Sequence, residues 1–166
     1  MKAYIEQLID YNYWANGLIL KYAEKLPAEV FTKPISDTEG SPRRKLAHIM
    51  FAERYWLDRM AGTPVSVEEM EKQIGPKNFP TIKELYGAWF DLELRMRQFL
   101  AEFDEKQLVK TFKHTRSDGT ELEYRYIDIF THIVLHGMQH RAEMAQILTD
   151  LGHSPGNLDY NVYLHP

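Results

Sequence analysis

Residues 126–151 read YIDIFTHIVLHGMQHRAEMAQILTDL, a pattern typical of a long amphipathic helix. Apolar side chains recur every three or four positions, and Gly152 follows the last of them, with Pro155 shortly after. A helical wheel drawn from these apolar residues centres the core-facing side near Gly137 and Met144. The stretch therefore predicts a helix that packs along one side against the rest of the protein.

Three histidines of this helix are spaced four residues apart, at His132, His136 and His140. Four steps of about 100° return almost to the starting azimuth, so all three lie on one stripe. His140 and His136 are nearer to the core-facing side than His132, which makes them the better candidate ligands. A pair of imidazoles binds a metal ion weakly, so a site here needs a ligand from a neighbouring element.

The same periodicity predicts three further long helices, at about residues 3–26, 42–62 and 81–103. Pro27 ends the first, and Ser41-Pro42 has the form of a helix start. In the Pro- and Gly-containing connection 63–80, Ser66 can cap a short helix. These patterns predict an all-α four-helix bundle, formed by a single domain of residues 1–166.

Two smaller segments are also expected to be ordered. Asp118-Gly119 lies between β-prone stretches around 109–112 and 121–124, which predicts a short hairpin or extended loop before the last helix. The tail 157–164 is rich in aromatic residues, so we expect it to pack back on the bundle.

His48 is the natural third ligand, because it lies inside the second predicted helix at the flank of its apolar stripe. Three neutral imidazoles leave coordination positions open, as catalytic metals require. The remaining histidines, His114, His153 and His165, fall in loop or terminal segments, where we expect solvated side chains. The alternative for the whole set is hydrogen bonding to backbone or carboxylate groups without any metal.

Several residues near these histidines have two interpretations. Asn12 could orient a ligand or be satisfied by backbone groups, and Phe51 and Tyr55 could line a pocket entrance or belong to the core. Gly137 costs about 1 kcal/mol of helix propensity relative to alanine. We therefore expect another helix or a ligand to approach closely at Gly137.

Composition narrows the possible partners. The sequence has 20 Lys and Arg against 24 Asp and Glu, a net charge of -4, which disfavours nucleic acid and anionic membranes. Its apolar runs are short, and Glu6 stands where a secretory signal would be hydrophobic, so a cytoplasmic protein without a membrane span is expected. Cysteine is absent, which leaves any metal to histidine and carboxylate ligands.

Taken together, these motifs resemble the DinB/YfiT-like family of metal-binding four-helix proteins. The resemblance spans nearly the whole chain. It is carried by Asp10–Asn16, Gly40-Ser41, Leu46–Ile49, Glu53, Trp56-Leu57, Asp118–Thr120, His132–Arg141 and Leu158–Tyr160.

The resemblance implies a metal site formed by His48, His136 and His140, with His132 in the second shell or the pocket wall. It also implies one divalent transition metal per chain (nickel, zinc, iron or manganese), a small-molecule substrate, a low-molecular-weight thiol as cosubstrate, and a homodimer. The ligand types alone do not name the metal.

Three functions follow from these expectations. The first is metal-dependent transfer of a low-molecular-weight thiol to an electrophile. The second is hydrolysis by metal-activated water, for which Glu143 or Glu53 is a candidate base, although no HExxH motif is present. The third is a metal-stabilised, non-catalytic stress-response module. No catalytic acid or base is assigned by the sequence.

Overall fold

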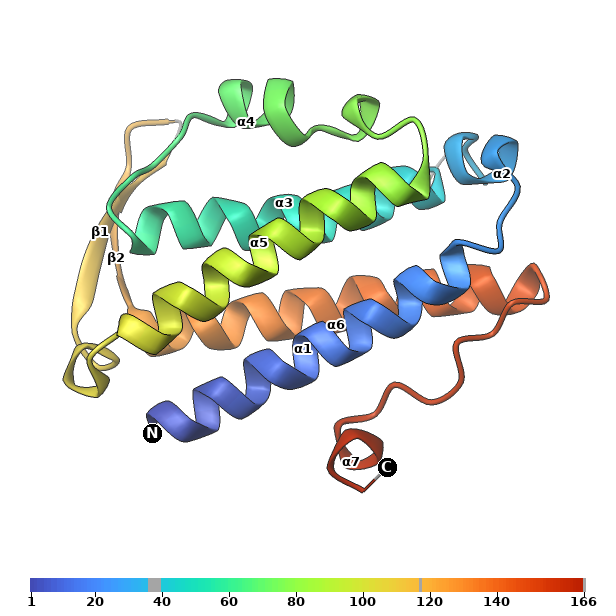
Figure 1. Cartoon of the computed structure of the whole chain (residues 1–166). Coiled ribbons are helices and arrows are strands. Elements are labelled where there is room, and N and C mark those ends of the chain that lie inside the picture. Colours follow the sequence, from blue (N-terminus) through green and yellow to red (C-terminus); the bar gives the residue numbers. More distant parts are fainter. Residues whose placement is uncertain (36–39, 117, 166) are drawn as a thin grey trace.

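A computed structural model describes residues 1–35, 40–116 and 118–165, and within them it is mostly helical. Four long helices run side by side: α1 (Lys2–Ala23), α3 (Pro42–Met60), α5 (Ile82–Glu102) and α6 (Tyr126–Asp150) (Figure 1). The predicted all-α four-helix bundle is thus confirmed. Among the helices of the described residues, none combines the length and the hydrophobicity that a transmembrane span requires.

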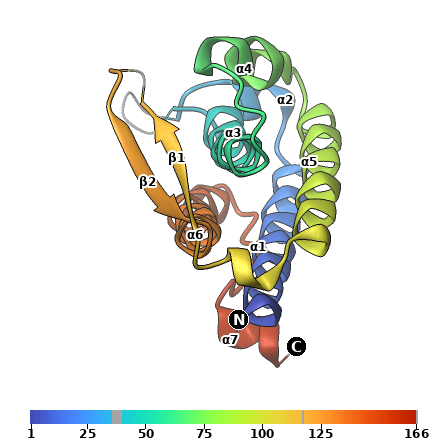
Figure 2. The same ribbon diagram turned by 90° about the vertical axis from the view of Figure 1, so that its left-hand side faces the viewer.

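The four long helices form a ring in which α6 packs against α1 and α3, and α5 packs against the same two helices. Helices α1 and α3 consequently lie diagonally opposite each other, as the view along the bundle shows (Figure 2). The apolar stripes read from the sequence form one continuous core between them. Met144, near the centre of the wheel drawn for α6, is fully buried.

Local sequence signals define the helix starts. The Ser41 hydroxyl accepts a hydrogen bond from the backbone N–H of Arg44 at 3.2 Å, which caps α3. The Ser66 hydroxyl accepts from the N–H of Glu69 at 3.1 Å and caps the expected short helix, α4 (Val67–Ile74), which packs on α3. One short helix, α2 (Ala28–Thr32), was not expected from the sequence, because five residues are too few to show a helical period.

A β-hairpin of β1 (Thr111–Thr115) and β2 (Glu121–Arg125) precedes α6, as predicted, with its strands paired antiparallel. Gly119 in its loop has φ 84°, a conformation that glycine adopts without strain. The C-terminal tail also packs back as expected: it includes α7 (Tyr160–Leu164), and the Tyr11 hydroxyl donates to the Leu158 carbonyl at 2.9 Å.

The prediction that His114 is a solvated surface histidine is wrong. His114 lies on β1 and is only 7% exposed. Its Nδ1 accepts a hydrogen bond from Arg59 Nε at 3.3 Å, and its Nε2 lies 3.2 Å from the Tyr55 hydroxyl, so the ring links the hairpin to α3. The sequence does not reveal this, because the contacts of the ring with Tyr55, Trp56 and Arg59 form only when the hairpin docks on α3.

This docking makes the stability of the protein depend on pH. Burial, reinforced by the positive charges of Arg59 and Arg116, lowers the pKa of His114 below its usual 6.5. The unfolded chain therefore binds a proton at His114 before the folded protein does, and the free energy of unfolding falls as pH decreases below about 6.5. In His114→Gln the free energy of unfolding should depend less steeply on pH, by a slope that corresponds to the uptake of up to one proton on unfolding. Urea unfolding of metal-free protein between pH 5.5 and 7.5 measures this slope. Identical slopes for parent and variant would contradict this assignment.

Candidate metal centre

Three histidines from two helices converge beside the bundle. His48 projects from α3, and His136 and His140 project from adjacent turns of α6. Each offers one ring nitrogen such that the three atoms all lie within 4.8 Å of one another. The centroid of the His48 ring lies 5.0 Å from that of the His136 ring and 4.7 Å from that of the His140 ring. This separation allows the three imidazoles to hold one metal ion.

The position of each histidine around α6 follows the order expected from the wheel. His136 and His140 are partly buried, whereas His132 is exposed. The His132 ring packs 5.7 Å from the His136 ring and 5.7 Å from Trp56, so it borders the three-histidine group without belonging to it.

The pKa values of two of these histidines favour the neutral form that binds a metal ion. Burial and the neighbouring His140, His48 and His132 lower the pKa of His136 to about 4. Burial and His140 also lower the pKa of His48. Both rings are therefore neutral at pH 7, and each presents a lone pair without first having to lose a proton.

Glu143 orients one of the three rings. Its Oε2 lies 2.9 Å from His140 Nδ1 and also accepts from Lys45 Nζ at 3.1 Å. The hydrogen bond from His140, together with that from Lys45, lowers the pKa of Glu143, so the carboxylate is ionised and His140 Nδ1 carries the proton. In the neutral form of the ring the lone pair is then on His140 Nε2, in the carboxylate–histidine arrangement common at metal sites.

A pocket of about 600 Å³ opens beside His48 and His140. It lies between α3, α6 and the α4 segment, and its apolar lining includes Phe51, Val67 and Pro76. Charged groups line it as well: Arg44, Lys45, Glu71 and Glu143. A small molecule in this pocket would lie next to two of the three histidines.

Of the other candidates from the sequence, Phe51 lines this pocket, but Asn12 and Tyr55 do not. Asn12 is fully buried within the bundle, and the Tyr55 hydroxyl contacts His114. The suggested role of Glu53 as a base has to be corrected. Its side chain is 1% exposed and accepts hydrogen bonds from other side chains inside the bundle.

The sequence reasoning missed Arg44 and Lys45, which both lie at the start of α3. Their distance of three to four residues from His48 is a signal that could have found them, because such neighbours share one side of a helix.

Comparisons with known proteins agree with the fold and with these motifs. The family model described as "DinB family" matches residues 1–166. The protein named "Protein DinB" of Bacillus subtilis (strain 168) is 24% identical over 169 residues, which cover 99% of this chain and 95% of that protein.

The hydrogen bond between Glu143 and His140 predicts an effect on metal affinity. In Glu143→Gln, the ring of His140 loses the anion that fixes its tautomer, and nickel affinity should fall by roughly tenfold or more, as is usual for outer-shell partners. Competition with a coloured chelator measures this loss. Glu71→Gln is the matched control, since Glu71 lines the same pocket, and an equal loss in both variants would argue against the orienting role.

Proposed function

The chain belongs to the DinB family, and from this premise we propose that it is a metal-dependent enzyme that transfers a low-molecular-weight thiol to an electrophile. The observation that carries the proposal is the convergence of His48, His136 and His140 at the edge of a pocket of about 600 Å³. Three imidazoles would hold a divalent transition metal and leave room for a further ligand from the pocket side.

The bound metal would lower the pKa of a thiol and so supply a sulfur nucleophile at neutral pH. The chain has no cysteine, so this sulfur has to come from a cosubstrate. His48 and His136 contribute neutral rings, and Glu143 keeps the ring of His140 correctly oriented.

The pocket lining fits a small molecule with both apolar and charged parts. Phe51, Val67 and Pro76 provide an apolar wall, and the exposed Arg44 provides a guanidinium group for an anionic substituent. These residues would bind and orient the cosubstrate beside the histidines.

Hydrolysis is less well supported by the same pocket. Glu53 is buried away from it, and Glu143 is already engaged with His140 and Lys45. Thiol transfer depends less on a carboxylate base, because the pKa of a free thiol, about 8.5, is far closer to neutrality than that of water, about 15.7, and coordination to a metal would lower it further. The positions of the two glutamates therefore favour thiol transfer over water activation.

Metal content tests the first half of the proposal. Untagged protein should contain about one transition metal ion per chain by elemental analysis, as expected for a single three-histidine site. His48→Ala, His136→Ala and His140→Ala should each lose most of the metal. His132→Ala is the control and should keep its stoichiometry, since its ring lies outside the group. A parent protein that is purified without metal and does not bind added nickel, zinc, manganese or iron would refute the proposal.

Turnover tests the second half. Several low-molecular-weight thiols are offered together with an aryl halide or an epoxide, and loss of electrophile is followed with and without metal. We expect consumption that requires metal and is abolished in His136→Ala. A fully metal-loaded protein that consumes no electrophile with any thiol would refute thiol transfer while leaving the metal site intact.

Arg44 provides a finer prediction within this scheme. In Arg44→Gln, the KM for an anionic thiol should rise by roughly tenfold while kcat changes little, because the lost interaction is made equally in ground and transition states. Lys83→Gln, on an exposed position of α5, is the charge-matched control. An unchanged KM in Arg44→Gln would remove Arg44 from the binding site.

A further inference from the structure

All four long helices contribute to one set of polar side chains in the middle of the bundle. We call it the buried polar cluster, and each of its members is at most 2% exposed: Asn12 and Asn16 from α1, Glu53 from α3, Trp89 from α5 and Arg141 from α6. Glu53 accepts from the Trp89 indole N–H at 3.1 Å, which ties α5 into the cluster.

The two asparagines connect a buried cation to a buried carboxylate. Arg141 Nη1 donates to Asn12 Oδ1 at 2.5 Å and to Asn16 Oδ1 at 2.8 Å. The Nδ2 groups of the same asparagines donate to Glu53 Oε1 at 2.9 and 3.0 Å. Both amide groups are thus oriented by a donor on one side and an acceptor on the other. The result is a link from α6 to α3 that passes through α1.

This cluster adjoins the histidine group along the chain. Arg141 directly follows His140, Gly137 directly follows His136, and Glu53 lies on the same helix as His48. A Cβ added at Gly137 would lie 2.5 Å from Arg141 Nη1 and 2.7 Å from Asn12 Oδ1. The close approach expected at this glycine therefore comes from α1 and from Arg141, on the buried side of α6.

We propose that the buried polar cluster holds α3 and α6 in the register that brings the three imidazoles together, and that Asn12, Asn16, Glu53 and Arg141 are positioning residues for the metal site. This inference rests on the proposed function for the role of the metal. An N–H···O hydrogen bond requires a donor–acceptor distance of about 2.7–3.2 Å, and one residue of axial slip in a helix is about 1.5 Å. A slipped α6 would break both asparagine links, so the cluster excludes registers in which the histidines are apart.

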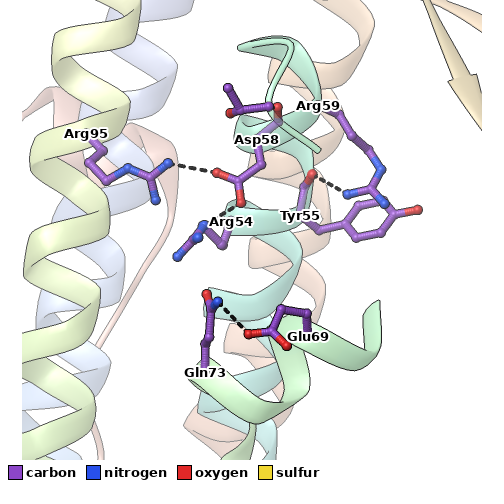
Figure 3. A network of polar contacts seen from close by, with 8 residues as sticks. Arg54, Tyr55, Asp58, Arg59, Glu69, Gln73 and Arg95 are labelled. Atoms are coloured by element: carbon purple, nitrogen blue, oxygen red, sulfur yellow. Dashed lines mark hydrogen bonds and ion pairs between the residues drawn. The ribbon is translucent and has the colours of Figure 1, made fainter. Parts of the chain in front are cut away.

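A second buried carboxylate on α3 provides a matched control. The side chain of Asp58 is 2% exposed and accepts from Arg54 Nε at 2.5 Å and from Arg95 Nη2 at 2.7 Å (Figure 3). Arg54 is on α3 itself and Arg95 is on α5, so these bonds do not reach α6. Substitution of Asp58 should therefore cost stability without moving α6 against α3.

The experiment compares Asn12→Ala, Arg141→Lys and Asp58→Asn in the full-length chain. Arg141→Lys keeps the charge but cannot reproduce the guanidinium geometry, so it separates positioning from charge pairing. Unfolding by urea gives the stability of each variant, and imidazole ¹H–¹⁵N spectra of metal-free protein report the surroundings of His48, His136 and His140. Competition with a chelator then gives the dissociation constant for nickel.

We expect Asn12→Ala and Arg141→Lys to move the three imidazole resonances and to weaken nickel binding by about 10- to 100-fold, the usual range for supporting groups of metal sites. Asp58→Asn should lose stability but keep the parent resonances and a nickel affinity within about twofold of the parent value, well below that range. If Asn12→Ala does not fold, Asn16→Ala replaces it. It removes one of the two links and keeps the one through Asn12, so it should change the resonances and the nickel affinity in the same direction but by less.

Two results would overturn the inference. In the first, the imidazole resonances and the nickel affinity stay unchanged in both cluster variants. In the second, Asp58→Asn loses as much stability as the cluster variants and shows equal changes in its resonances and its nickel affinity. The imidazole spectra need neither metal nor thiol. A parent protein without transferase activity, or without bound nickel, would therefore count against the proposed function, while the spectra would still decide the role of the cluster.

Discussion

A positive charge is buried at the centre of this bundle, and its neutralisation constrains every long helix. Arg141 is 2% exposed, and removing such a charge from water is costly unless hydrogen bonds and an opposite charge compensate for it. Burial raises the pKa of Glu53 on the neighbouring helix, whereas its hydrogen-bond donors and the charge of Arg141 favour its ionised form. Two asparagines of α1 fill the space between Arg141 and Glu53 and bond to both. An apolar core would tolerate small shifts of its helices, whereas these directional bonds do not.

The two sides of α6 have different tasks as a result. Its buried side carries Gly137 and Arg141 and contacts α1, and the adjoining side carries His136 and His140, of which His140 lines the pocket. Helical geometry joins these tasks, because residues 136 and 137 and residues 140 and 141 are consecutive. Any force that sets the rotation of α6 in the core also sets where its imidazoles lie.

Much of the fold could be predicted because the signals are local. Three-four apolar spacing identified the long helices, Ser41 and Ser66 marked two helix starts, and Asp118-Gly119 indicated the hairpin. The interpretation of His114 failed for the opposite reason. Nothing near it in the sequence shows that the hairpin docks on α3, and its partners Tyr55 and Arg59 are more than fifty residues away.

The sequence alone determined the helices, the shared stripe of His132, His136 and His140, and the choice of His48 as the third histidine, since these depend on helical period and on residue type. The tertiary structure added that Glu143 orients His140 and that Arg44 and Lys45 line the pocket, and it alone decided that Glu53 belongs to the core. The roles of Asn16 and Arg141 were likewise visible only in the tertiary structure. Their hydrogen bonds join helices that are distant in the chain, and such bonds depend on distances that no periodic pattern contains.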